Sequence, residues 1–247
     1  MSLRLAGRVQ RVRPSPTVSI TALAGKLREE GKDIIGLSAG EPDFPTPEHI
    51  QDAANAAIRG GDTKYTAVDG STSLKAAIQG KFARDNKLDF QLDEIIVSAG
   101  GKQVCYNACQ ALLQIGDEVI IPAPYWVSYP DMVRLAGAEP VIVPTMSSAK
   151  FRMSAEQLRN AITPQTRAIF VNSPCNPTGT VYSRDDWLAW GEVLREHPDV
   201  ILITDDIYEH ISWGAPFLSF LTVCPDLHEQ VLTVNGVSKC YAMTGWR

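Results

Sequence analysis

The end of the chain holds a lysine and an arginine in surroundings that suit chemistry. Lys239 follows Ser238 just past a strand-like run, among small and polar residues, and Arg247 is the last residue of the sequence. An amine in such a place can attack an aldehyde, and an arginine can hold a phosphate group. The pair therefore predicts a lysine that forms a Schiff base with a phosphorylated aldehyde. A lone lysine is usually a solvated surface charge, so this prediction depends on other groups.

Two glycines precede a predicted helix in the run SAGGKQ at 98–103. Gly100 and Gly101 let the backbone approach an anion, and the helix that begins there offers free amides and the positive end of its dipole. The run is therefore a candidate phosphate cup, with an ordinary turn as the alternative. Its spacing is neither GxGxxG nor that of a Walker motif, so it gives little support to nucleotide binding.

Two further runs follow predicted strands and carry ring-binding groups. Tyr125 and Trp126 come after the strand at 118–121, and such aromatic side chains can stack on a planar ring or simply pack at a domain edge. The run NSPCNPTGT at 172–180 forces a tight polar turn. In this turn Asn176 can present its amide to an oxygen of a ring.

The run TDDIYEH at 204–210 ends a buried strand with a carboxylate. A carboxylate in such a position must be hydrogen-bonded or paired with a cation. Asp205 can therefore meet a protonated ring nitrogen, and Tyr208 can reach a ring oxygen. Asp206 is expected to be the exposed neighbour. A helix N-cap is the alternative role for the aspartate.

These groups need a sheet to bring them together, and the chain from residue 95 onward predicts one. Short β-branched runs alternate with helical stretches, which indicates a parallel or mixed sheet covered on both faces, hence an α/β fold. In open sheets of this class, ligands bind beyond the carboxyl ends of the strands, where all these groups lie. The expected strands are 95–97, 118–121, 141–143, 168–171, 200–203 and 231–234, and the expected helices of this part are 101–114, 128–136 and 185–196.

The N-terminal part of the chain has a different pattern. A helix is expected at 17–30, ended by Gly31, and the prolines of the stretch at 38–47 favour an extended or turning chain. Further helices are expected at 48–60 and 71–86. We place a boundary near residue 45, which separates an N-terminal arm (1–45) from the α/β body (46–247).

Composition narrows the classes of function. The 247 residues carry a net charge of −5 with a pI near 5.4, which argues against a general nucleic-acid binder. No stretch approaches the roughly 20 apolar residues of a membrane span. The scattered cysteines do not predict a disulfide framework or a metal site and are expected to be buried thiols, which favours a reducing, cytoplasmic compartment. They are Cys105, Cys109, Cys175, Cys224 and Cys240.

Taken together, these runs resemble the fold-type I aminotransferases that use pyridoxal phosphate, and most closely the aspartate aminotransferase subfamily of bacteria and archaea. The resemblance covers nearly the whole chain. It implies a three-layer α/β sandwich with a mostly parallel sheet, the cofactor-binding large domain, plus an N-terminal arm from an incomplete small domain. The runs are GEPDFPTP at 40–47, KYTAVDGS at 64–71, SAGGKQ at 98–103, PAPYWVSYP at 122–130, NSPCNPTGT at 172–180, TDDIYEH at 204–210 and GVSKCYAMTGWR at 236–247.

The resemblance implies a role for each ring-binding group. Lys239 would hold the cofactor as an internal aldimine and, once freed, would move the proton between the substrate Cα and the cofactor. Asp205 would keep the pyridine nitrogen protonated, which makes the ring an electron sink. Tyr208 and Asn176 would bond the phenolic oxygen, and Trp126 would stack on the ring.

The resemblance also implies how the phosphate and the substrate are held. Tyr65 would reach the phosphate of the neighbouring subunit, because the family builds its sites across a homodimer interface. Gly40, Trp126 and Asn176 would contact the substrate. The phosphate ligands within the chain would be Gly100, Gly101, Lys102 (through backbone amides), Ser238 and Arg247.

The implied activity is transfer of an amino group between an L-amino acid, with aspartate expected, and a 2-oxo acid such as 2-oxoglutarate. Aromatic and prephenate-type substrates stay open. The alternatives are a pyridoxal-phosphate-dependent β-lyase on the same fold and a non-catalytic fragment that binds cofactor or only dimerises. Family members are longer, so the resemblance implies a chain cut after Arg247, without the C-terminal small domain and its substrate-binding arginine. We expect weak or no transamination from such a chain.

Overall fold

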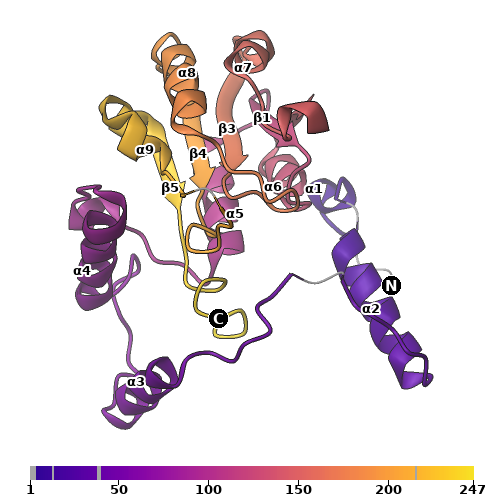
Figure 1. The fold of residues 1–247 in the computed structure, drawn as a ribbon, viewed down its shortest axis with the longest axis vertical. Coiled ribbons are helices and arrows are strands. Elements are labelled where there is room, and N and C mark those ends of the chain that lie inside the picture. The colour runs from indigo at the N-terminus through magenta and orange to yellow at the C-terminus, as the bar shows by residue number, and fades with distance from the viewer. Residues whose placement is uncertain (1–3, 13, 38–39, 215) are drawn as a thin grey trace.

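A parallel five-stranded sheet forms the centre of the computed structural model, which describes residues 4–12, 14–37, 40–214 and 216–247 (Figure 1). The strand order is β2-β1-β3-β4-β5, and every neighbouring pair is parallel. Pairing of Asn172 with Asp205 brings the carboxyl ends of β3 and β4 level. The strands are β1 (Glu118–Ala123), β2 (Glu139–Pro144), β3 (Thr166–Asn172), β4 (Ile201–Asp205) and β5 (Val231–Val234).

The sheet has an apolar core on each face, as its sequence pattern predicts. In β3, Ala168 and Phe170 pack into one cluster, whereas Ile169 and Val171 pack into the other. Successive side chains of a strand point to opposite faces, so a continuously apolar strand must be covered on both sides. Burial of both faces is what the β-branched runs indicated.

Helices cover the two faces and complete three layers. On one face lie α5 (Gly101–Leu112) and α6 (Tyr129–Ala136). On the other lie α7 (Ala155–Ala161), α8 (Arg184–Arg195) and α9 (Phe220–Val223), with the indoles of Trp187 and Trp190 fully buried. The predicted α/β sandwich is therefore confirmed, and α7 and α9 are helices that the sequence pattern did not reveal. Cys105, Cys109 and Cys224 are buried in these layers, as expected, whereas Cys175 and Cys240 are only half-buried.

In the residues that the structure describes, four α-helices come before α5 and the sheet. They are α1 (Gly7–Gln10), α2 (Pro16–Glu29), α3 (Glu48–Arg59) and α4 (Thr72–Lys81). The first three contain no buried residue among those described, and Figure 1 shows α2 and α3 lying away from the sheet. The helix expected at 71–86 is α4 followed by a π-helical turn at Phe82–Asn86. Within the described part of the chain, no helix combines the length and apolar character needed to span a membrane.

The expected strand at 95–97 is wrong. Residues 95–97 follow a short 3-10 turn at Leu92–Glu94 and belong to no strand, although the Ile95 backbone is extended. A strand requires a ladder of hydrogen bonds to a neighbour. Here the Val97 N–H donates to Asp69 O at 2.9 Å, and the segment is not part of the sheet that the described residues form. An apolar β-branched run is therefore not sufficient for a strand.

The start of α8 provides a test of how local sequence fixes this fold. Ser183 and Asp186 form a capping box, in which the Asp186 N–H donates to Ser183 Oγ at 3.2 Å. We expect Ser183→Ala to lower the free energy of unfolding by about 1 kcal/mol, measured by urea denaturation. Ser15→Ala is the matched control, because Ser15 occupies the N-cap of α2 without a side-chain capping bond. Equal losses from both substitutions would contradict this account.

Candidate active site

The candidate site lies at the carboxyl ends of β1, β3 and β4. The strand order places β2 and β3 on opposite sides of β1. The connection after β1 therefore runs to one side of the sheet, and β3 and the later strands are added on the other side. Such a switch point opens a crevice at the carboxyl edge of a sheet. Trp126 follows β1, Asn176 follows β3, and Asp205 ends β4.

Asp205 is buried and held from two sides. Its Oδ2 accepts a hydrogen bond from the Tyr129 hydroxyl at 2.5 Å, and its Oδ1 accepts the Ile207 N–H at 3.3 Å. Burial raises the pKa of the Asp205 carboxyl, and these hydrogen bonds oppose that rise. A cation placed next to this carboxylate would therefore be bound strongly, because the carboxylate has no charge partner of its own among the described contacts.

Tyr129 is a site residue that the sequence analysis missed. It lies in α6, and its ring stacks on Phe170 of β3 with centroids 4.8 Å apart. Burial and the nearby Asp205 charge raise the pKa of its hydroxyl well above the ordinary value, so it remains a donor. A buried tyrosine needs a hydrogen-bond partner. Its place three residues after Trp126, at the start of α6, is the signal that could have identified it.

A second missed residue, Asn172, connects the two neighbouring loops. Its Nδ2 donates to Asp205 O at 2.7 Å, and its Oδ1 accepts the Asn176 N–H at 2.6 Å. The Asn176 side chain in turn lies next to the Tyr208 hydroxyl. Burial first, and then the charge of Asp205, raise the pKa of the Tyr208 hydroxyl, and the Asn176 side chain opposes them. The structure thus brings Asp205, Asn176 and Tyr208 together, as expected from the sequence.

The predicted phosphate cup is built from the start of α5 and the end of the chain. Gly100 adopts φ +91°, and a Cβ there would collide with the Arg247 side chain. The Arg247 guanidinium donates to Thr244 O at 2.7 Å and lies 3.5 Å from Ser238 Oγ. The first amides of α5 have no side-chain cap. A glycine cradle, a helix N-terminus, a hydroxyl and a guanidinium form a donor set that fits a phosphate group.

Lys239 lies beside this cup. Its Nζ donates to Gly40 O at 2.5 Å, so the segment at 40–47 reaches the site as well. Partial burial and the positive charge of Arg247 lower the pKa of the Lys239 amine, with Glu41 acting in the opposite direction. An amine with a lowered pKa is more often neutral and therefore more nucleophilic near neutral pH.

The lowered pKa of the Lys239 amine can be tested without any cofactor. We expect reductive methylation of Lys239 by formaldehyde and cyanoborohydride to rise through a midpoint at lower pH than that of free Nα-acetyl-lysine, because only the neutral amine reacts. The measurement is mass spectrometry of samples labelled across a pH series with Nα-acetyl-lysine as internal standard. If Lys239 and Nα-acetyl-lysine gained methyl groups at the same pH, the proposed environment of the Lys239 amine would be wrong.

Trp126 borders the site from the β1 side. Its ring lies 5.3 Å from that of Tyr129, at 87°. The Lys102 Nζ sits 5.1 Å from the centroid of Trp126, a cation–π contact. The resemblance assigned only the backbone amide of Lys102, so the placement of its side chain against the aromatic wall is an addition from the structure.

Asp206 and Tyr65 differ from the other residues singled out in the sequence in where the structure places them. Asp206 was expected to be exposed, but it is only 3% exposed, because its N–H donates to Val234 O at 2.8 Å and draws the residue into the sheet edge. Tyr65 is fully exposed, with a relative accessibility of 107%, so the structure does not bring it to the other candidate residues. Its expected role in a neighbouring subunit stays a prediction.

Pyridoxal phosphate fits the groups that the structure brings together. The cup offers donors for a phosphate, Asp205 offers a buried carboxylate for a ring nitrogen, and Lys239 offers an amine. Tyr208 and Asn176 add donors for a ring oxygen, and Trp126 adds an aromatic face. Each kind of group on the cofactor therefore has a complementary residue type in this chain.

Comparisons with known proteins agree with this chemistry. The family model described as aminotransferase class I and II matches residues 32–247. The chain is 56% identical over 246 residues, or 99% of its length, to an aspartate/prephenate aminotransferase of Nitrosomonas europaea, and covers 62% of that protein. The chain thus spans about three fifths of the length of the curated relatives it matches.

Solved structures give the same result for the fold. An aspartate aminotransferase from Rhizobium meliloti matches with a TM-score of 0.96 and 50% identity, covering 100% of this chain and 62% of that one. An aspartate aminotransferase from Thermus thermophilus with maleate matches with a TM-score of 0.95 and 47% identity, covering 100% and 63%. Nearly all of the present fold therefore has a counterpart in these enzymes.

Proposed function

Because this chain belongs to the class I and II aminotransferase family, we propose that it binds pyridoxal phosphate and acts in transamination between an L-amino acid and a 2-oxo acid. The observation that carries the proposal is the position of Lys239. Its partly buried amine has a lowered pKa and lies beside the Arg247–Ser238 cup. In this proposal Lys239 Nζ would hold the cofactor through its aldehyde carbon, with the aldehyde oxygen leaving as water.

Other residues are proposed to hold the ring. Asp205 keeps a proton on the ring nitrogen, and Tyr129 and Ile207 fix the orientation of its carboxylate. Tyr208 and Asn176 donate to the ring oxygen, and Trp126 covers the ring face. The ring, when bound, supplies an acceptor for the electron pair left on the substrate Cα. The proposed phosphate ligands are Gly100, Gly101, Lys102, Ser238 and Arg247.

Lys239 also has the proposed task of moving the substrate proton. Once displaced by an amino-acid substrate, the free amine of Lys239 would accept the proton from the substrate Cα as general base and would later return it as general acid. A lowered pKa suits this role, since the amine must be neutral before it can accept a proton. The contact of Lys239 with Gly40 O supports a position for Gly40 near the substrate.

We propose aspartate as the amino-acid substrate, on the basis of the names of the relatives, which include both aspartate and aspartate/prephenate aminotransferases. We propose 2-oxoglutarate as the 2-oxo acid, which the family resemblance implies. We also propose a homodimer in which Tyr65 reaches the partner site, consistent with its full exposure. The same proposal includes a division into an N-terminal arm at 1–45 and a large domain at 46–247. It also includes a cytoplasmic location, which the free cysteines support.

A single-turnover assay tests the proposed reaction. The chain is loaded with pyridoxal phosphate and given aspartate without an acceptor, and the products are identified by mass spectrometry. We expect oxaloacetate and the amino form of the cofactor in equal amounts, formed slowly, in keeping with the weak transamination expected from the sequence. A parallel assay with cysteine tests for a β-lyase, which would release sulfide and give pyruvate with ammonia instead. Conversion no faster than with free pyridoxal phosphate would contradict transamination by this chain.

A further inference from the structure

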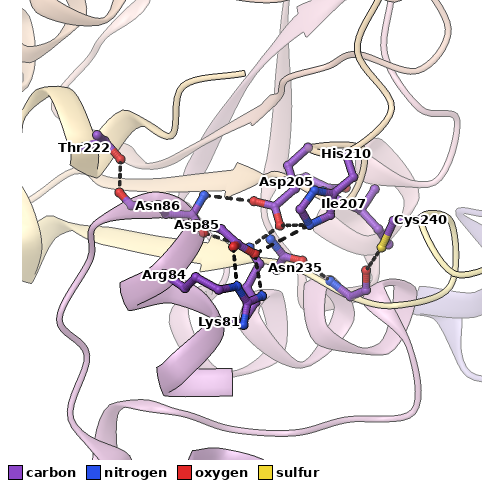
Figure 2. Close-up of polar contacts among 12 residues, drawn as sticks. Lys81, Arg84, Asp85, Asn86, Asp205, Ile207, His210, Thr222, Asn235 and Cys240 are labelled. Atoms are coloured by element: carbon purple, nitrogen blue, oxygen red, sulfur yellow. Dashed lines mark hydrogen bonds and ion pairs between the residues drawn. The ribbon is translucent and has the colours of Figure 1, made fainter. Parts of the chain in front are cut away.

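A buried polar cluster surrounds Glu209, near the end of the 205–210 turn that is remote from Asp205. The proposed function leaves this cluster without a role. The Glu209 side chain is only 3% exposed, and its carboxylate forms an ion pair with Lys81 at the end of α4. Glu209 Oε2 also accepts a hydrogen bond from Asn86 Nδ2 at 2.9 Å, and His210 Nε2 lies 3.1 Å from Oε1. Figure 2 shows Lys81, Asn86 and His210 converging on one point.

The cluster is anchored to the rest of the fold. Lys81 Nζ donates to Asn86 Oδ1 at 2.8 Å, so the cation and the amide orient each other. Asn86 O accepts the Thr222 hydroxyl at 2.8 Å, which attaches the cluster to α9. Phe82, between Lys81 and Asn86, is part of the apolar core. Glu209 is therefore held by a rigid support, about 120 residues away in sequence.

The two ends of the 205–210 turn are fixed by different elements. The Asp205 end is held by Asn172 and Tyr129, from β3 and α6. The far end is held at Glu209, whose own N–H donates to Asp206 O at 3.0 Å. Tyr208 lies directly before Glu209, and its carbonyl accepts the Ile211 N–H at 2.7 Å. The described contacts thus restrain the Tyr208 backbone mainly through Glu209.

We propose that Glu209, held by Lys81 and Asn86, is a positioning residue that fixes Tyr208 for contact with the cofactor. The inference rests on the proposed function, because it assigns the cluster to the same site. A buried carboxylate with its charge partner and hydrogen bonds in place has one preferred position. Loss of one partner leaves the other charge buried and unpaired, so the turn moves to expose it.

The test uses the full chain with Glu209→Gln, Lys81→Met and Asn86→Ala. The first readout is hydrogen exchange of the Ile211 amide, which reports on its bond to Tyr208 O and needs no cofactor. We expect about tenfold faster exchange in the first two variants and a smaller increase in Asn86→Ala, with the amides of β3 unchanged. The second readout is the affinity for pyridoxal phosphate, measured by absorbance titration, which we expect to fall about tenfold.

The control pair is Glu196→Gln and Arg159→Met, because these two residues form an exposed ion pair at 2.9 Å between α7 and the end of α8. Both control variants should keep the Ile211 exchange rate and the cofactor affinity. The inference is overturned by unchanged Ile211 exchange in all three test variants. It is also overturned by equal acceleration in β3, which would mean a general loss of stability. A wild-type chain that fails to bind pyridoxal phosphate would refute the proposed function separately, and the exchange result would still decide whether Glu209 holds the turn.

Discussion

Replacement of Lys239 by alanine is expected to abolish covalent capture of pyridoxal phosphate by this chain. The wild-type protein should shift the near-visible absorption band of the cofactor on mixing, because an imine with the amine replaces the aldehyde that is conjugated with the ring. Lys239→Ala removes the amine that lies beside the Arg247–Ser238 cup. The variant should therefore show only the spectrum of the free cofactor.

The control for this result is Lys64→Ala, which removes an exposed lysine. It should retain the full shift of the band. Unfolding of both variants by urea should match that of the wild type, since Lys239 Nζ makes one described hydrogen bond, to Gly40 O. A shift that survives in Lys239→Ala would mean that another amine captures the aldehyde.

Asp205→Asn is the second substitution with a large expected effect. The amide keeps the shape of the side chain and can still accept the Tyr129 hydroxyl, but it removes the charge that a protonated ring nitrogen would meet. A hydrogen bond to a charged group contributes about 1.5–3 kcal/mol, so we expect the affinity for pyridoxal phosphate to fall roughly ten- to hundredfold. The measurement is an absorbance or fluorescence titration of the cofactor.

Asp206→Asn is a matched control in the neighbouring position. Burial, together with the charge of Asp205, raises the pKa of the Asp206 carboxyl well above its usual range. The protonated acid that burial favours resembles an amide in shape and charge, so this variant should bind the cofactor nearly as the wild type does. Equal losses in both variants would show that the effect comes from disturbance of the turn and not from the charge of Asp205.

The sequence predicts the layers of the fold well, because the apolar composition of the strands indicates that both faces of the sheet are buried. The run at 168–171 alternates between two cores, and its β-branched and apolar composition reveals this directly. The run at 95–97 has the same composition but no partner in the described sheet. Local composition indicates that a segment can be a strand, whereas pairing depends on tertiary context.

The candidate site likewise contains residues that the local sequence identifies and residues that depend on tertiary packing. Lys239, Asp205 and Asn176 can be identified because each follows a predicted strand, and the carboxyl edge of a parallel sheet brings such residues together. Tyr129 and Glu209 depend on how helices dock: the first on α6 against β3, the second on α4 across a long separation in sequence. The burial of Asp206 likewise results from its bond to Val234 O on the adjacent strand.

The central claim is that Lys239 is the attachment point of pyridoxal phosphate, and borohydride trapping tests it most directly. The wild-type chain is mixed with one equivalent of cofactor, reduced with borohydride, digested and mapped by mass spectrometry. The account predicts one phosphopyridoxyl group per chain, on the peptide that contains Lys239. Label spread over exposed lysines, or found chiefly on another residue, would contradict it.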